Sequence, residues 1–217
     1  MVIALAVGAA VLGLLVGHGV NRAAGRFPWG ADADRAVAVR LPAVEAATAL
    51  LFVLAVLRFS VSWELPAFLF LAAAGVLLGV IDLQHRLLPN RVVGPAIGIG
   101  AALLALAAAG EQDWPSLLRA ALGGVALFTV FLVLALIAPS GLAMGDVKLA
   151  ALLGLYLGWI GWNAVVIGGA AGFVVQAAAA LVLLATRRIG LRGELPFGPA
   201  MLLGALLAIG WSDSFLH

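Results

Sequence analysis

The 217-residue sequence contains no cysteine. Disulfide bonds, thiolate zinc sites and a cysteine nucleophile are therefore all excluded. The three histidines, His18, His85 and His217, lie far apart, and none belongs to an HExxH motif or another closely spaced ligand pair. We therefore expect neither a metal centre nor a cofactor.

Charged residues are also scarce. Only 10% of the residues are Asp, Glu, Lys or Arg, whereas soluble globular domains contain about 25%. The formal net charge of +2 comes from a few arginines in loops that form no basic face, so nucleic-acid binding is not expected. Hydrophobic residues make up 65% of the chain, a composition typical of an integral membrane protein embedded in the lipid bilayer.

The hydrophobic residues fall into runs long enough for an α-helix to cross about 30 Å of hydrocarbon. These runs predict an all-α, polytopic bundle of about eight transmembrane helices. No long polar linker divides the chain, so we expect one transmembrane domain over residues 1–217. The predicted spans cover residues 2–20, 42–59, 65–82, 92–110, 117–138, 147–161, 163–185 and 196–212.

Lys and Arg are distributed unequally between the two ends of these spans. With the N-terminus outside, only Arg58 and Arg119 lie in outer loops. Cytoplasmic loops carry the excess of positive charge in membrane proteins, which favours this orientation. It places Asp82 and Asp146 at the cytoplasmic face. The inner loops then hold Arg22, Arg26, Arg35, Arg40, Arg86, Arg91, Lys148, Arg187, Arg188 and Arg192.

Asp82 is the first candidate for chemistry. It lies within about one turn of the cytoplasmic end of its predicted span, and Pro89 then opposes continuation of the helix. An ionisable residue at the edge of a membrane segment is a functional candidate. The alternative is a solvated loop aspartate that pairs with His85 or Arg86.

Asp146 is the second candidate. It follows Gly145 and the helix-breaking sequence Pro139-Ser140-Gly141. Irregular backbone near membrane depth is tolerated only where it is buried in protein or lines a wet cavity. The alternative is that Lys148, two residues further on, simply neutralises Asp146.

As a pair, these two carboxyls suit aspartic protease chemistry. Carboxyls held a few ångströms apart cannot both ionise cheaply, so one stays neutral while the other is charged. The neutral acid can protonate a scissile carbonyl while the carboxylate activates water. The sequence does not decide which aspartate has which role.

At these residues the chain resembles the prepilin peptidases, also called type IV leader peptidases, which are membrane aspartic proteases of the GxGD type. Asp82 with the segment 87–90 is similar to the first catalytic motif of that family, and the segment 144–149 is similar to the second. Segments 17–21, 40–45 and 194–199 also resemble family segments. The resemblance implies catalytic roles for Asp82 and Asp146. It makes supporting or substrate-binding candidates of Gly145, Lys148, Pro89 and Asn90.

Glu45 is a further supporting candidate. It lies just inside the second predicted span, where an isolated carboxylate would be costly. We therefore expect Glu45 to be protonated, paired with an inner-loop arginine, or directed at a cavity.

The activity that the resemblance implies is removal of the N-terminal leader from type IV prepilin-like proteins at the cytoplasmic face of the bacterial cell membrane. It implies a glycine before the scissile bond and an apolar helix after it. The substrate helix would reach the aspartates laterally through the bilayer.

Two features depart from the family pattern. Position 143 is alanine where the GxGD pattern has its first glycine, and we expect this to be tolerated unless the site needs a positive φ. The loop at residues 21–41 is short and lacks the paired CxxC zinc motifs of longer members, which also methylate the new N-terminus. The resemblance therefore gives no support for methyl transfer.

Two other functions remain open at this point. A proton-coupled transporter would use Asp82, Asp146 and Glu45 as a relay, although a relay needs carboxyls at staggered depths. A catalytically inactive family member that handles pilins is the second alternative, and Ala143 is the feature that favours it.

Overall fold

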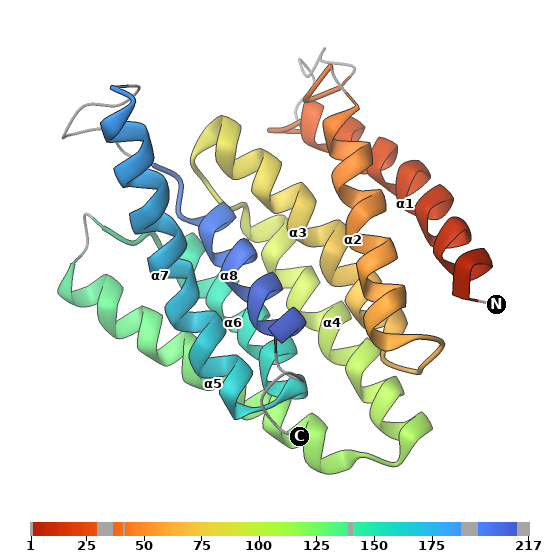
Figure 1. The fold of residues 1–217 in the computed structure, drawn as a ribbon. Coiled ribbons are helices and arrows are strands. Elements are labelled where there is room, and N and C mark those ends of the chain that lie inside the picture. Colours follow the sequence, from red (N-terminus) through yellow and green to blue (C-terminus); the bar gives the residue numbers. More distant parts are fainter. Residues whose placement is uncertain (1, 30–36, 41, 139–140, 188–194, 212–217) are drawn as a thin grey trace.

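The computed structural model describes residues 2–29, 37–40, 42–138, 141–187 and 195–211. The described residues form eight α-helices, which confirms the predicted all-α bundle (Figure 1). Pro139, Ser140, Glu194, Arg35, Arg188 and Arg192 lie outside the described residues. The helices are α1 (Val2–Gly25), α2 (Ala43–Phe59), α3 (Leu65–His85), α4 (Asn90–Glu111), α5 (Trp114–Ile137), α6 (Met144–Ile160), α7 (Trp162–Ala185) and α8 (Gly198–Trp211).

The helix boundaries follow local signals in the sequence. Pro66 lies in the first turn of α3, where its missing N–H costs no helical hydrogen bond. Pro89 is the N-cap residue of α4, and α5 begins where Asp113 accepts a hydrogen bond from the backbone of Ser116. The weak break predicted near residues 158–163 is a turn at Gly161 between α6 and α7.

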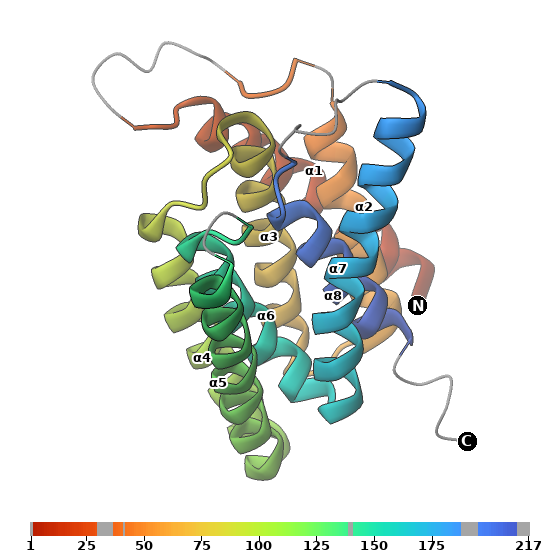
Figure 2. The ribbon, with the colours of Figure 1, turned by 90° about the vertical axis from the view of Figure 1, so that its left-hand side faces the viewer.

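The length and burial of the helices differ. α1, α3, α4, α5 and α7 are long and apolar enough to cross a membrane, which makes the chain a multi-pass membrane protein. α6 has 17 residues, and 12 of them are buried. It packs against α4, α5, α7 and α8 in the middle of the bundle (Figure 2). A helix that is apolar on all sides is stable in such a position because every face meets another helix.

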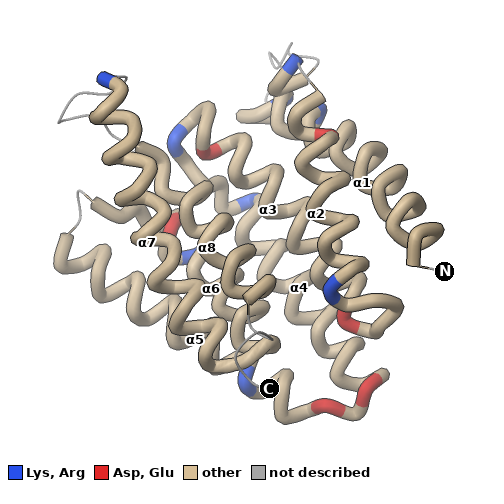
Figure 3. Tube along the Cα trace, in the orientation of Figure 1, with Lys and Arg blue, Asp and Glu red and all other residues tan. Residues whose placement is uncertain are grey.

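The charged residues lie mainly at the two ends of the bundle (Figure 3). One end holds the last turn of α3 and the first turn of α6, with Asp82 and Asp146. The opposite end holds Arg58 in the last turn of α2, Glu64 before α3 and Asp113 before α5. The fold thus brings two carboxyls that are far apart in the sequence to the same end of the molecule.

Candidate active site

Asp82 is held between two helices. It lies in the last turn of α3, and only 4% of its surface is exposed. Its Oδ2 atom accepts a hydrogen bond of 3.0 Å from the backbone N–H of Gly198, the first residue of α8. The alternative of a solvated loop aspartate is therefore wrong. α3 ends just beyond, where Arg86 adopts a left-handed conformation with φ of 53°.

Asp146 lies in the first turn of α6, and 7% of its surface is exposed. Its Oδ2 atom accepts a hydrogen bond of 2.9 Å from the backbone N–H of Ala143. The first turn of a helix leaves backbone donors unpaired, and a carboxylate three residues on satisfies one of them. The hydrophobic pattern predicts that this helix starts at residue 147, but α6 begins at Met144. The hydrogen bond to Asp146 explains the earlier start.

The alanine of the GxGD-like segment fits the backbone. Ala143 has a φ of −85°, a conformation that any L-residue adopts without strain. The condition under which alanine would be harmful, a positive φ, is therefore not met.

Both aspartates line one cavity of about 450 Å³. The cavity is open on one side and is lined by the end of α3, the α3–α4 loop, the segment 141–146 and the segment that leads into α8. Two carboxyls that share one cavity disfavour each other's ionisation. The lining residues are Asp82, Arg86, Leu87, Leu88, Gly141, Leu142, Ala143, Gly145, Asp146, Leu195, Pro196 and Phe197.

Gly145 and Pro89 shape the edge of this cavity. A Cβ atom at position 145 would lie 2.9 Å from Cβ of Leu88, so glycine lets the start of α6 approach the α3–α4 loop closely. Pro89 is the last residue of that loop, has an extended backbone and is the N-cap of α4. Gly145 is in the cavity lining, whereas Pro89 is next to it.

Lys148 and Asn90 form a link between α6 and α4. The Nζ atom of Lys148 donates a hydrogen bond of 2.7 Å to Oδ1 of Asn90. Among the residues that the structure describes, no ion pair joins Lys148 to Asp146. Lys148 thus fixes the position of the α6 start relative to α4, and the alternative that it neutralises Asp146 is not supported.

Glu45 lies outside the cavity lining. Its Oε1 atom accepts a hydrogen bond of 3.1 Å from Nδ2 of Asn21 and lies 3.5 Å from Nδ1 of His18. Asn21 also bonds both the N–H and the carbonyl of Val39, which holds the α1–α2 loop against α1. The structure therefore places Glu45 in a separate cluster with Asn21 and His18, and no arginine among the described residues pairs with it.

Sequence reasoning singles out Gly198 and Phe197 only as members of the family-like segment 194–199 and gives neither a contact with Asp82. The segment 194–199 resembles a family segment, but nothing in its composition says that a backbone N–H would reach Asp82. That contact depends on how α8 packs against α3. Among the described residues, no group of three or more His, Asp or Glu gathers as a metal site.

Comparisons with known proteins show which family the chain belongs to. Residues 68–216 match the type IV leader peptidase family. The chain belongs to that family. It is similar to a protein of Bacillus subtilis named prepilin leader peptidase/N-methyltransferase, with 35% identity over 181 residues, which is 81% of this chain and 67% of the relative.

Relatives from other bacteria carry the same name. The protein of Pseudomonas aeruginosa is 30% identical over 179 residues, which is 82% of this chain and 60% of the relative. That of Xanthomonas campestris is 29% identical over 187 residues, which is 83% of this chain and 62% of the relative. The chain thus spans about three fifths of the length of these two relatives. No solved structure matches it.

Proposed function

We propose that this protein is a membrane-embedded aspartic endopeptidase. It removes the N-terminal leader from type IV prepilin-like proteins at the cytoplasmic face of a bacterial cell membrane, and residues 1–217 form one peptidase domain. The observation that carries the proposal is the shared cavity lined by the buried carboxyls Asp82 and Asp146. Membership of the leader peptidase family and the names of the relatives support it.

The chemistry follows from the paired carboxyls. One carboxyl is neutral and protonates the oxygen of the scissile carbonyl, while the other is ionised and takes a proton from a bound water. The water oxygen bonds to the carbonyl carbon, the C–N bond breaks, and the leaving nitrogen accepts a proton from the pair. The products are the leader carboxylate and a new N-terminal amine.

The site geometry disfavours a proton relay across the membrane. A relay needs carboxyls at staggered depths, but Asp82 and Asp146 line one cavity at one end of the bundle. The proposal covers leader cleavage only. The names of the relatives also include N-methyltransferase, but the loop at residues 21–41 carries no cysteine for the zinc motifs of longer members.

Co-expression with a prepilin-like substrate tests the proposal. We expect wild type to cleave the substrate, and Asp82→Asn and Asp146→Asn each to lower the rate by about 10³-fold or more, because Asn keeps the size but loses the titratable proton. The double variant should be no slower than either single one, since the residues act as a unit. The mass of the product N-terminus identifies the cleaved bond.

Asp113→Asn is the matched control. It removes a carboxyl at the opposite end of the bundle, and asparagine caps a helix as well as aspartate does. Its cleavage rate should equal that of wild type. Cleavage that survives either Asp82→Asn or Asp146→Asn would contradict the two-aspartate mechanism.

A further inference from the structure

α5 and α7 form the side of the bundle that faces the viewer in Figure 2. The side chain of Leu127 on α5 faces Gly169 on α7, and two phenylalanine rings meet beside this contact. A Cβ atom at Gly169 would lie 3.0 Å from Cδ2 of Leu127, and the rings of Phe131 and Phe173 lie 5.4 Å apart. We call the contact made by these four residues the α5–α7 seam. Phe173 is 39% exposed, so the seam reaches the surface that faces lipid.

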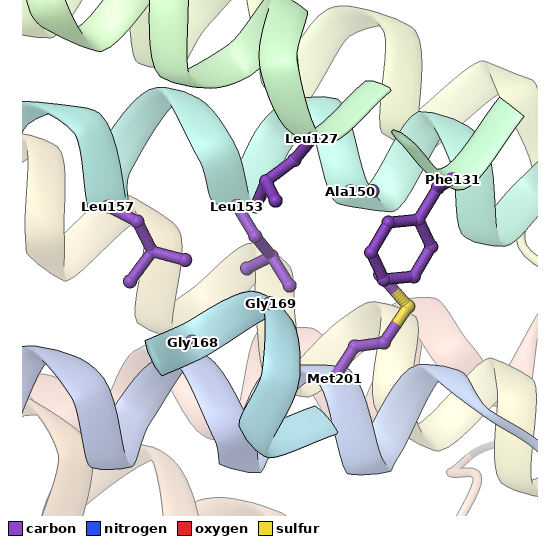
Figure 4. Close-up of a pocket in the computed structure, with 8 residues that line it drawn as sticks. All are labelled: Leu127, Phe131, Ala150, Leu153, Leu157, Gly168, Gly169 and Met201. Atoms are coloured by element: carbon purple, nitrogen blue, oxygen red, sulfur yellow. The ribbon is translucent and has the colours of Figure 1, made fainter. Parts of the chain in front are cut away.

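The seam continues directly from the catalytic cavity. Phe197 lines the cavity, and its ring lies 5.0 Å from that of Phe173 and 6.2 Å from that of Phe131. Behind the seam is an apolar pocket lined in part by Ala150 and Met201 (Figure 4). Ala150 follows Asp146 by four residues on α6, and Met201 follows Phe197 by four, so each lies one helical turn deeper on the same face.

The pocket is closed in this structure. Its volume is about 10 Å³, about the least that one water molecule needs. A polypeptide segment can enter along this path only if α5 and α7 move apart. The lining is almost wholly apolar, which suits an apolar helix arriving from lipid and not a charged leader.

The neighbouring contacts are stronger than the seam. α5 and α6 approach backbone to backbone, since a Cβ atom at Gly123 would lie 2.6 Å from the carbonyl oxygen of Gly154. α7 and α8 do the same, with a Cβ atom at Gly204 only 2.5 Å from the backbone nitrogen of Gly172. Such close contacts between small residues hold helices together in lipid. Opening the seam leaves both helix pairs intact.

The boundary between α3 and α8 is a poorer entrance. The hydrogen bond from Gly198 to Asp82 crosses it, so separating these helices would displace a proposed catalytic carboxyl. Opening between α5 and α7 leaves that bond unbroken.

We propose that the α5–α7 seam is the lateral entrance through which the apolar segment of the substrate reaches the catalytic cavity. The occupant is the membrane-embedded apolar helix that follows the scissile bond. Phe131, Phe173 and Phe197 part to admit its N-terminal end, and the pocket beneath accommodates its first turns. This inference rests on the proposed function.

Disulfide locks test it, because the chain has no native cysteine. Leu127→Cys with Gly169→Cys ties α5 to α7, and Gly75→Cys with Leu202→Cys ties α3 to α8. The two pairs are matched, since Cβ atoms at Gly169 and Gly75 would lie 3.0 and 3.1 Å from the respective leucine Cδ2 atoms. Each variant is assayed oxidised and reduced on the full-length, membrane-inserted substrate that wild type cleaves, and gel mobility verifies the disulfide.

Oxidation of the α5–α7 pair should lower the cleavage rate by at least about tenfold relative to the same variant reduced, because only the open form admits substrate. Oxidation of the α3–α8 pair should leave the rate unchanged. An equal effect on both pairs, or an effect on the α3–α8 pair alone, overturns the inference. Absence of cleavage by wild type contradicts the proposed function itself. Failure of the proposed function is therefore distinguishable from failure of the proposed entrance.

A second measurement does not depend on disulfide formation within the protein. In an Asp146→Asn background that retains substrate, a single cysteine replaces either Phe173 in the seam or Val125 on the lipid-facing side of α5, which is 63% exposed. The substrate carries a cysteine in its apolar segment. We expect a cross-linked product with Phe173→Cys and none with Val125→Cys. The reverse pattern, or equal yields, contradicts entry at the seam.

Discussion

At the scale of single residues, Gly198 is a position where any side chain would collide with a proposed catalytic carboxyl. Its N–H donates to Asp82, and a Cβ atom there would lie 2.7 Å from Oδ2 of the same carboxyl. Gly198→Ala must therefore push the carboxyl away. We expect kcat to fall by about 10²-fold with little change in KM, since small displacements of a reacting group are costly.

Gly210→Ala in the same helix provides the control for that variant. No heavy atom would lie within 4 Å of a Cβ at position 210, so its kinetics should match those of wild type. Steady-state rates on one prepilin-like substrate measure both variants. Equal kcat values for Gly198→Ala and Gly210→Ala, or a change confined to KM, would contradict the inference that Gly198 positions the Asp82 carboxyl.

At the scale of elements, the starts of α5 and α6 each carry a carboxyl that accepts a backbone N–H group. Asp113 begins α5 in this way, and the hydrogen bond from the Ser116 hydroxyl holds the pKa of Asp113 below its usual value. A lowered pKa means that the ionised form stabilises the fold, and that this contribution is lost as pH falls below the usual carboxyl range of about 4.

Asp113→Ala should therefore lower the free energy of unfolding by about 1 kcal/mol at neutral pH, the usual cost of a lost N-cap. The difference from wild type should shrink in acid, as the pH falls toward the lowered pKa of Asp113. Denaturant unfolding in detergent at about pH 7 and about pH 3 measures this. Glu111→Ala, at an exposed carboxyl two residues earlier, is the control. A difference from wild type that stays the same at both pH values would refute the pH-dependent cap.

At the scale of the whole molecule, the distribution of charge predicts orientation. The end that holds Asp82 and Asp146 also carries most of the Lys and Arg residues that the structure describes (Figure 3). The positive-inside rule predicts that this end faces the cytoplasm. Because the chain lacks cysteine, single exposed positions at each end report the orientation without further changes.

We expect a membrane-impermeant maleimide to label Gln112→Cys in intact cells. Thr186→Cys, at the opposite end of the bundle and also exposed, should react only after the membrane is permeabilised. The control is the unsubstituted chain, which has no thiol. Labelling of Thr186→Cys in intact cells would invert the orientation and place the proposed active site outside the cytoplasm.

The sequence alone determined the membrane class, the eight helices and the two candidate aspartates. Apolar runs of bilayer length have few alternatives to helices, because lipid offers no partner for unpaired backbone groups. Asp82 and Asp146 can be identified from the sequence because charged residues are rare where lipid surrounds the chain. The boundary of α6 was less predictable, because a polar residue in a first helical turn looks like a loop residue in a hydrophobicity pattern.

Only the tertiary structure decided which residues meet. Gly198 is 116 positions from Asp82, and the contact exists because α8 packs against α3. Glu45 carries a carboxyl like the two aspartates, yet the packing of α1 against α2 brings it next to Asn21 and His18. Helix packing depends on the shapes of facing surfaces, above all where small residues permit close approach. Local patterns therefore fix the helices, whereas the cavity and its entrance arise from contacts between them.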